Sequence, residues 1–356
     1  MNAPFAPSST GAGEAIRRAD LRQPDEVARI EGFVAELGGS VFHRPAWLIA
    51  IERGTGQQAH GLVAERCGAL VGWLPLSDVH SPIFGRALVS SGFAVGGGVL
   101  AERVSTALQL AEAAKELAQR LGCATVELRG GPMPRGWDTA SDRHCGFEIE
   151  LAQDDEAQLL AIPRKQRAEL RKGLEADLTV HIGTDPEDRA AHYAVYAESV
   201  RNLGTPVFPK GLFDAVLDAL DADILTVRHR GRPVATVLSL YHGGAVLPYW
   251  GGGTGEARAL RANDRMYFEL MRHARARGCS LFDFGRSKTG SGAYHFKKNW
   301  GFEPQPLSYA GWCAPGAERR DTDPTSAKHA ARIALWKHLP LAIANRLGPP
   351  IARGLG

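Results

Sequence analysis

The stretch FDFGRSKTGSGAYHFKKNWGF, residues 282–302, concentrates the side chains of this chain that are best suited to chemistry. It holds the acid Asp283, four glycines, and the four cations Arg286, Lys288, Lys297 and Lys298. Glycines let a backbone approach a ligand closely, and ammonium groups bind an anionic donor or a developing oxyanion. The stretch therefore suits acyl transfer to an amine, in which a tetrahedral intermediate carries negative charge.

Two other kinds of chemistry are not supported. Asp283-Phe284-Gly285 spells a kinase signature, but the chain has no H-R-D loop and no G-x-G-x-x-G loop, which excludes a kinase. The G-x-S-x-G motif of serine hydrolases is also absent. One structural alternative stays open: Asp283 and Arg286 form a local ion pair, and residues 292–302 are a loop that leads to a last strand.

Composition indicates an ordinary globular protein. A length of 356 residues favours two domains, and 44% hydrophobic with 23% charged residues allows a large core. The net charge of +3 does not by itself indicate nucleic-acid binding. Five scattered cysteines without a C-x-x-C pair support neither a disulfide scaffold nor a structural zinc site. Without a signal-like start or a run of 18 apolar residues, we expect a cytoplasmic protein.

The elements that position the conspicuous stretch occur twice. LVAERCGALVGWLPLSDV, from Leu62, and LTVRHRGRPVATVLSLYH, from Leu225, both predict two strands joined by a glycine turn. Each copy continues with a glycine-rich stretch, a helix that ends at Gly122 or Gly278, and a short strand after a cysteine. Because a helix joins two strands, part of each sheet is expected to be parallel. The sequence thus predicts an α/β (α+β) protein with two mixed sheets flanked by helices.

We expect four parts along the chain. They are an N-terminal tail at 1–30, a first domain at 31–155, a second and chemical domain at 156–312, and a linker with C-terminal helices at 313–356. The C-terminal helices should be broken at Pro340 and Pro349, and residues 326–356 hold five Lys or Arg and no acid. Their basic, amphipathic pattern has two explanations, which are contact with the inner membrane and an ordinary packed tail.

The second copy is expected to carry the chemistry. The first copy has Glu127 and Arg129 at the strand end but no block of lysines and aromatics. In the second copy Tyr294, Phe296 and Trp300 supply flat surfaces that exclude water. Two features have open interpretations: Trp250, beside three glycines, contacts substrate or belongs to the core, and the basic stretch 164–172 contacts tRNA phosphates or faces solvent.

The order of these motifs resembles the FemAB group of aminoacyl and acyl transferases, which are built from two GNAT-like domains. The resemblance rests on YWGGGTGEARALRANDRMYFELMRHARARGCSLFDFGRS, from Tyr249, and on GAYHFKKNWGFEP after it. In the first half it rests on FHRPAWLIAIE and LVGWLPLSDVHSPIFGRALVSSGFAVGGG, and it covers most of residues 40–312. In detail the chain looks most similar to FemAB-like proteins associated with exosortase/PEP-CTERM and exopolysaccharide loci.

The resemblance implies roles for particular residues. Lys297 would stabilise the oxyanion, the backbone carbonyl of Phe296 would contact the amine, and Arg201 matches a family arginine near a helix end. With Asp283 as a third catalytic residue, the expected substrate-binding residues are Arg201, Trp250, Arg286, Lys288, Tyr294, Lys298 and Trp300. The family lysine that contacts acceptor phosphates is replaced by Ile51, so a UDP-sugar–pentapeptide acceptor is not specified.

The expected function is N-acyl or aminoacyl transfer to an amine in a cell-envelope, peptidoglycan-like or exopolysaccharide pathway. No metal and no tightly bound cofactor is expected. The donor would be an aminoacyl-tRNA or an acyl-CoA, and the acceptor a small molecule, a glycan or a peptide. The alternatives are an acyl-CoA-dependent N-acyltransferase and a non-catalytic GNAT pair that binds a glycan or a partner.

Overall fold

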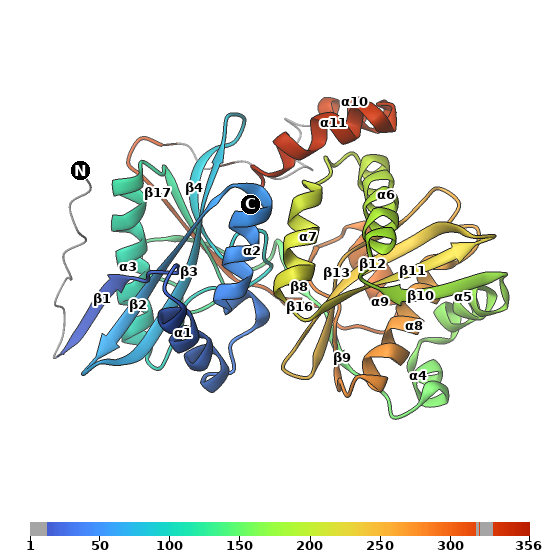
Figure 1. Cartoon of the computed structure of the whole chain (residues 1–356), viewed down its shortest axis with the longest axis horizontal. Helices are drawn as coiled ribbons and strands as arrows, with labels where there is room; N and C mark the ends of the chain where they lie inside the picture. Colours follow the sequence, from blue (N-terminus) through green and yellow to red (C-terminus); the bar gives the residue numbers. More distant parts are fainter. Residues whose placement is uncertain (1–12, 318–319, 321–329) are drawn as a thin grey trace. The chain divides into compact units, whose positions relative to one another are not determined.

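The computed structural model describes residues 13–317, 320 and 330–356 (Figure 1). The chain divides into two compact units. Unit 1 comprises the described residues of Met1–Ser141, Ser308–Thr322 and Pro350–Gly356, and unit 2 those of Asp142–Leu307 and Asp323–Pro349. Each unit is built on its own mixed sheet with helices on its faces, so the predicted α/β architecture is confirmed.

Unit 1 contains an eight-stranded sheet in the order β1-β2-β3-β4-β6-β17-β7, with β5 paired to β3. Its strands are β1 (Glu14–Arg18), β2 (Gln58–Arg66), β3 (Ala69–Ser81), β4 (Gly85–Ser90), β5 (Leu100–Ala101), β6 (Thr125–Arg129), β7 (Asp138–Ala140) and β17 (Tyr309–Cys313). Its helices are α1 (Pro24–Glu36), the short 3-10 helix Val41–His43, α2 (Pro45–Thr55) and α3 (Val104–Leu121). Strand residues alternate between faces: Leu62 and Leu74 pack with α3, whereas Val63 and Trp73 pack with α1 and α2.

Unit 2 contains a six-stranded sheet in the order β10-β11-β12-β13-β14-β9 and a three-stranded sheet in the order β15-β8-β16. Its strands are β8 (His144–Gly146), β9 (Glu148–Glu150), β10 (Leu178–Gly183), β11 (Ala222–His229), β12 (Arg232–His242), β13 (Ala245–Gly253), β14 (Leu281–Asp283), β15 (Ser287–Lys288) and β16 (Gln305–Pro306). Its helices are α4 (Asp155–Ala161), α5 (Arg164–Glu175), α6 (Pro186–Leu203), α7 (Lys210–Ala219), α8 (Ala262–Ala276), α9 (Gly292–Asn299) and α10 (Ala330–His338), with most of α11 (Leu341–Ala352).

The predicted repeat is confirmed. The hairpins β2–β3 and β11–β12 turn at Cys67-Gly68 and Arg230-Gly231, where both turn residues have positive φ. This is the pattern of a two-residue hairpin turn whose twist matches that of the strands. In each copy a helix, α3 or α8, then leads to a parallel strand, β6 beside β4 and β14 beside β13. Burial raises the pKa of Cys123, before β6, to about 12, so this cysteine is an inert core residue.

The boundaries between the two units differ from the domain boundaries predicted from the sequence. Strand β1 pairs with β2 along its whole length, so residues 14–18 belong to the first sheet, and residues 1–12 lie outside the described part. Strands β8 and β9 belong to unit 2. Strand β17, expected to end the second domain, pairs with β6 and β7 of unit 1. These pairings join residues far apart in the chain, which no local pattern reveals.

The C-terminal segment packs against the protein along part of its length. Helix α10 ends before Pro340 as expected, but α11 continues through Pro349, which corrects the predicted break. A side chain at Gly204, at the end of α6, would clash with Ile333 of α10. The linker expected at the start of 313–356 lies partly outside the described residues, which omit 318–319 and 321–329.

A buried histidine gives unit 2 a defined pH dependence. His192 of α6 lies with Nδ1 3.3 Å from Oγ1 of Thr236 and stacks on Tyr196. Burial lowers its pKa from 6.5 to about 3. Below pH 6.5 the unfolded chain takes up a proton that the folded chain does not. Folding stability therefore decreases as the pH decreases. We expect His192→Phe to remove a loss of about 1.4 kcal/mol per pH unit between pH 6 and 4, measured by urea unfolding.

The control for this prediction is His295→Gln, because His295 is exposed on α9. This control should keep the wild-type dependence of unfolding free energy on pH. If the His192 variant lost stability on acidification as steeply as wild type, the buried ring would not be the group that titrates.

Candidate functional site

The conspicuous stretch folds into a strand end, a loop and a short helix. Strand β14 is followed by the loop 284–286, by β15, by a turn at Gly290, and then by α9. The hydroxyl of Ser291 caps this helix by accepting a hydrogen bond from the Tyr294 N–H at 3.2 Å. Residues 292–299 are thus helical, which replaces the loop of the structural alternative. Helix α9 places Phe296 and Lys297 on different sides.

Lys297 turns inward to the loop after β14. Its Nζ donates to the carbonyl oxygens of Gly285, at 3.1 Å, and Arg286, at 3.2 Å. It also lies 5.1 Å and 5.3 Å from the ring centroids of Phe284 and Phe147. The residue is only 7% exposed. Two carbonyls account for two of the three N–H donors of the ammonium group, and the aromatic faces supply further stabilisation of its charge.

Charge and burial act in opposite directions on this lysine. Burial lowers the pKa of Lys297 to about 8, although nearby Asp283 favours the charged form. Burial in turn raises the pKa of Asp283, whose Oδ1 accepts a hydrogen bond from the Gly285 N–H at 2.8 Å. Asp283 therefore fixes the loop whose carbonyls hold Lys297. At neutral pH the lysine is charged, yet it can lose its proton slightly above pH 7.

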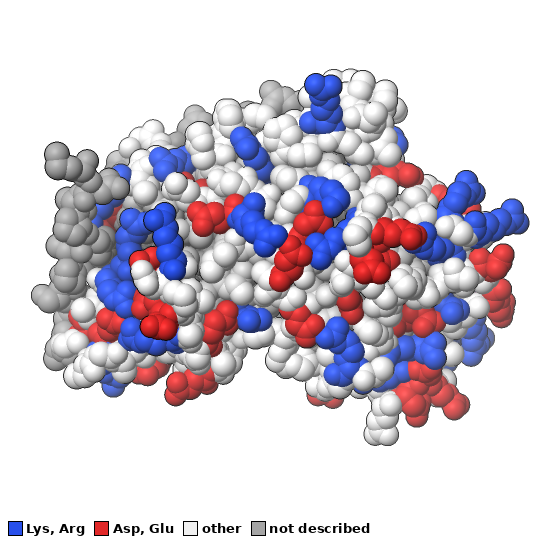
Figure 2. Space-filling model, viewed as in Figure 1, with Lys and Arg blue, Asp and Glu red and all other residues white. Residues whose placement is uncertain are grey.

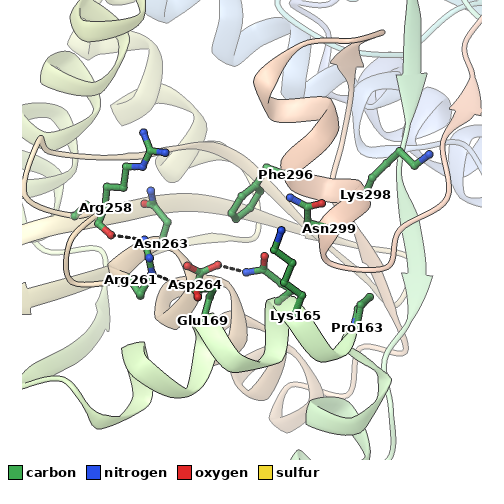
Figure 3. A pocket seen from close by; sticks show the side chains of 12 residues that line it. Pro163, Lys165, Glu169, Arg258, Arg261, Asn263, Asp264, Phe296, Lys298 and Asn299 are labelled. Atoms are coloured by element: carbon green, nitrogen blue, oxygen red, sulfur yellow. Dashed lines mark hydrogen bonds and ion pairs between the residues drawn. The ribbon is translucent and has the colours of Figure 1, made fainter.

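A cleft of about 660 Å³ opens on the other side of α9 (Figure 3). Its walls come from α5, from the loop before α8, from the first turn of α8, and from α9. Phe296 belongs to this wall, whereas Lys297 does not line it. Figure 3 shows Lys165 of α5 extending toward Phe296 and Asn299. Among the described residues, Lys165 and Arg258 of the lining form no ion pair, so the cleft carries uncompensated positive charge.

Asp264 gives the cleft a carboxylate with an unusual proton affinity. It lies in the first turn of α8, and its Oδ1 accepts from Gln166 Nε2 at 2.6 Å and Trp300 Nε1 at 3.3 Å. Burial raises its pKa from 3.8 to about 6, against these hydrogen bonds and nearby Arg261. Asn263, beside it, has a buried Oδ1 without a hydrogen-bond donor among the described residues. A ligand N–H or O–H could satisfy that oxygen.

The predicted site residues fall into three groups. Asp283, Arg286 and Tyr294 lie around Lys297. Asp283 fixes the loop that holds the ammonium group, Arg286 belongs to that loop, and the Tyr294 ring packs edge-on against Phe147 with 5.5 Å between ring centroids. Lys298 lines the cleft beside Phe296, with Nζ 5.9 Å from the Tyr294 ring centroid.

Other predicted residues lie elsewhere. Lys288 pairs with His144 in the small sheet, and Arg201 of α6 donates to the Lys337 carbonyl of α10 at 3.2 Å. Trp250 and Trp300 are 5% and 1% exposed, so both rings lie in the core of unit 2, and their expected contact with substrate stays a prediction. Trp250 packs against Phe213 at 5.1 Å because α7 covers its strand.

The two sheets differ where their parallel strands end. In unit 2, β13 pairs with β14 only through Ala245 and Val246, although β13 continues to Gly253, and its register with β12 shifts near Pro248. The strands therefore diverge beside the site, as bulged strands often do. In unit 1 the Ser90 hydroxyl accepts from the Arg129 N–H at 2.7 Å across the matching position. Protein groups thus bridge the end of that strand pair.

Sequence reasoning missed most of the cleft. Asp264, Asn263 and Gln166 were not identified, and Arg258 lay inside the quoted motif without a role. The one available signal was a polar start, Asn263-Asp264, on a helix that follows a glycine-rich strand. The raised pKa depends on burial beside Trp300, which sequence patterns do not reveal.

Comparison with known proteins identifies a domain in unit 2. Residues 163–298 match the model of an acetyltransferase (GNAT) domain, and this range includes the lining of the cleft except Asn299. A search of curated proteins finds no significant match.

Several solved structures share the fold at low sequence identity. FemX matches with a TM-score of 0.62 and 15% identity over 80% of this chain and 95% of its own. A tandem GNAT protein from the clavulanic acid biosynthesis pathway matches at 0.57 and 12%, covering 86% and 100%. L-PGS from Bacillus licheniformis matches at 0.54 and 14%, covering 95% and 99%. The fold is therefore of the tandem GNAT type, and the acetyltransferase domain of unit 2 supports an acyltransferase.

Proposed function

We propose that unit 2 transfers an aminoacyl or acyl group from a phosphate-bearing activated donor to an amine. The observation that carries this proposal is the cleft inside the acetyltransferase domain, which combines unpaired cations, a buried carboxylate and the Phe296 wall. GNAT-type transfer needs a donor held by its phosphates, a nearby amine, and groups that manage one proton and one negative charge.

The donor is aminoacyl-tRNA in the first version of the proposal. Lys165 and Lys298 lie on two walls of the cleft, and Arg164 and Arg171 extend the exposed cations along α5. Such an extended positive surface suits the backbone of a nucleic acid better than one pyrophosphate. An acyl-CoA donor is the alternative, since the same cations near the start of α8 suit a pyrophosphate.

The reaction forms a C–N bond and breaks the ester or thioester bond of the donor. The amine nitrogen attacks the carbonyl carbon, the carbonyl oxygen becomes negative, and the leaving group departs as an alcohol or a thiol with the amine's proton. In this proposal the Phe296 carbonyl orients the amine. That carbonyl accepts a hydrogen bond from the Trp300 N–H at 3.3 Å, and its second lone pair can accept another donor. The acyl carbonyl must pass α9 to reach the Lys297 ammonium, which lies outside the cleft lining and has one N–H that the Gly285 and Arg286 carbonyls do not use.

Asp264 is the group proposed to receive the amine's proton and to pass it on to the leaving alcohol or thiol. Its raised pKa, about 6, leaves the carboxylate ionised at neutral pH. It also makes this carboxylate a stronger base than an exposed one. It lies in the same cleft as Phe296. The acceptor amine belongs, in this proposal, to a cell-envelope or exopolysaccharide precursor. Ile51 is fully buried on α2, so no cation replaces the acceptor-binding lysine at that position.

Removing the charge of Lys297 tests the oxyanion role. We expect Lys297→Met, which fills the buried space, and Lys297→Ala to keep the fold and lower single-turnover transfer by about 10²-fold to 10³-fold. In wild type the ammonium is lost as pH rises through about 8, so the rate should fall there. Lys297→Arg stays charged and should lack this fall.

A rate that rises through pH 8 in wild type, and not in Lys297→Arg, would make Lys297 a general base instead. Full turnover by Lys297→Met with the donor that binds would remove Lys297 from the mechanism. Donor binding without turnover in the wild type would favour a non-catalytic pair.

Thermal unfolding with each donor identifies the donor class. We expect charged tRNA to raise the melting temperature, because a ligand at 100 times its dissociation constant adds about 2.7 kcal/mol of stability. Lys165→Glu with Lys298→Glu should weaken this protection. Lys210→Glu should not, since Lys210 is exposed on α7 and does not line the cleft. Protection by acetyl-CoA alone would select the acyl-CoA version, and protection by neither would contradict the donor site.

Asp264→Asn separates stability from catalysis. The folded protein holds this proton between pH 4 and 6 while the unfolded chain releases it, so the contribution of Asp264 to stability falls as pH rises through that window, opposite in sign to the contribution of His192. Asparagine does not ionise and still accepts from Trp300. We expect the variant to be more stable above pH 6 by on the order of 2 kcal/mol, with little difference near pH 4. Transfer should decrease in the same variant; an unchanged rate at every pH would leave Asp264 a structural role only.

A further inference from the structure

Helix α11 presents its side chains in the opposite sense to an ordinary surface helix. Ala344 and Gly348, four residues apart, face the protein and are buried. Ile343 and Leu347, on the neighbouring stripe, are 46% and 47% exposed. A surface helix normally buries its largest apolar residues. At these four positions of α11 the small residues are inside and the large ones are outside.

The small inner face has a packing reason. A Cβ atom at Gly348 would lie 3.0 Å from the backbone nitrogen of Val207, so glycine allows the helix to lie directly on the segment after α6. This close approach fixes the rotation of α11 about its axis. Ile343 and Leu347 cannot turn inward without moving Gly348 away from Val207.

The apolar surface extends beyond α11 to α10 and the end of α6. Leu335 of α10 is 68% exposed and Leu203 of α6 is 69% exposed. The residue after Leu203, Gly204, packs against Ile333 and Lys337 of α10. We call Leu203, Leu335, Ile343 and Leu347 the outer face. These are half of the eight large apolar residues that are exposed among the described residues.

The charge on the two C-terminal helices has one sign. Lys337 and Arg346 are exposed on the same two helices, and residues 326–356 contain no Asp or Glu. In Figure 2 the region that α10 and α11 occupy in Figure 1 is mainly uncharged, with scattered blue atoms. Apolar side chains beside cations are the pattern of a helix that lies on an anionic lipid surface.

We propose that the outer face binds an anionic lipid membrane from one side. Leu203, Leu335, Ile343 and Leu347 would enter the boundary between headgroups and acyl chains, and Lys337 and Arg346 would meet the phosphates. No helix among the described residues is long and apolar enough to cross a bilayer. A second copy of the chain fits less well, because a two-fold contact through this face would bring its cations together.

The test is cosedimentation of the full chain with two kinds of vesicle. One contains phosphatidylcholine alone, and the other contains about 30% phosphatidylglycerol, which makes the vesicle surface negative. We expect binding to the anionic vesicles and about tenfold weaker binding to the neutral ones. Ile343→Asn with Leu347→Asn should weaken anionic binding at least about tenfold. Lys337→Gln with Arg346→Gln should reduce the preference for anionic vesicles.

The matched control is Val104→Asn with Leu160→Asn, because these residues are 64% and 57% exposed and neither belongs to the outer face. The control pair should bind vesicles as wild type does. Equal loss in both pairs, or no binding by wild type, would overturn the proposal. Sedimentation equilibrium covers the remaining outcome: a dimer that Ile343→Asn with Leu347→Asn dissociates would assign the face to a second copy. Donor protection in the thermal assay does not depend on this face, so either proposal can fail alone.

Discussion

A buried ammonium group must be solvated by the protein, and Lys297 imposes this requirement at the centre of unit 2. The carbonyls of Gly285 and Arg286 meet it, and they can do so because the loop after β14 turns back at a positive φ of 68°. Asp283 holds the same turn through the Gly285 N–H. Once the loop and the lysine are fixed, the position of α9 is fixed, and Phe296 faces the cleft.

Local patterns predicted the parts of the fold whose partners are near in sequence. The hairpins followed from apolar runs around glycine turns, and the ends of α3 and α8 followed from Gly122 and Gly278, which both adopt positive φ. The block of lysines and aromatics located one wall of the cleft. Helix α9 was missed because its eight residues have little intrinsic stability and depend on the Ser291 cap and on packing. Asp264 was missed because its proton affinity comes from burial.

The two units show how one scaffold can be open in one copy and bridged in the other. Both copies have a parallel strand pair reached through a helix. In unit 1 the space beyond that pair is crossed by Ser90 and by the Arg129 guanidinium, which donates to the Ala94 carbonyl at 2.6 Å. In unit 2 the divergence is kept, and Asn263 of the cleft has a buried Oδ1 without a hydrogen-bond donor among the described residues. A binding site commonly retains such imperfectly satisfied groups.

Strand β17 has a consequence for synthesis on the ribosome. Strand β6 has β4 on one side, but its other neighbour is β17, at Tyr309–Cys313. Until β17 emerges from the ribosome, the sheet of unit 1 has an open edge of unpaired backbone groups. The strands of unit 2 are synthesised during the same interval. Unit 2 can form most of its pairings in that interval, so the part of the protein that starts first is completed last. A translation product that ends before β17 would keep this unpaired edge, which could pair with other chains.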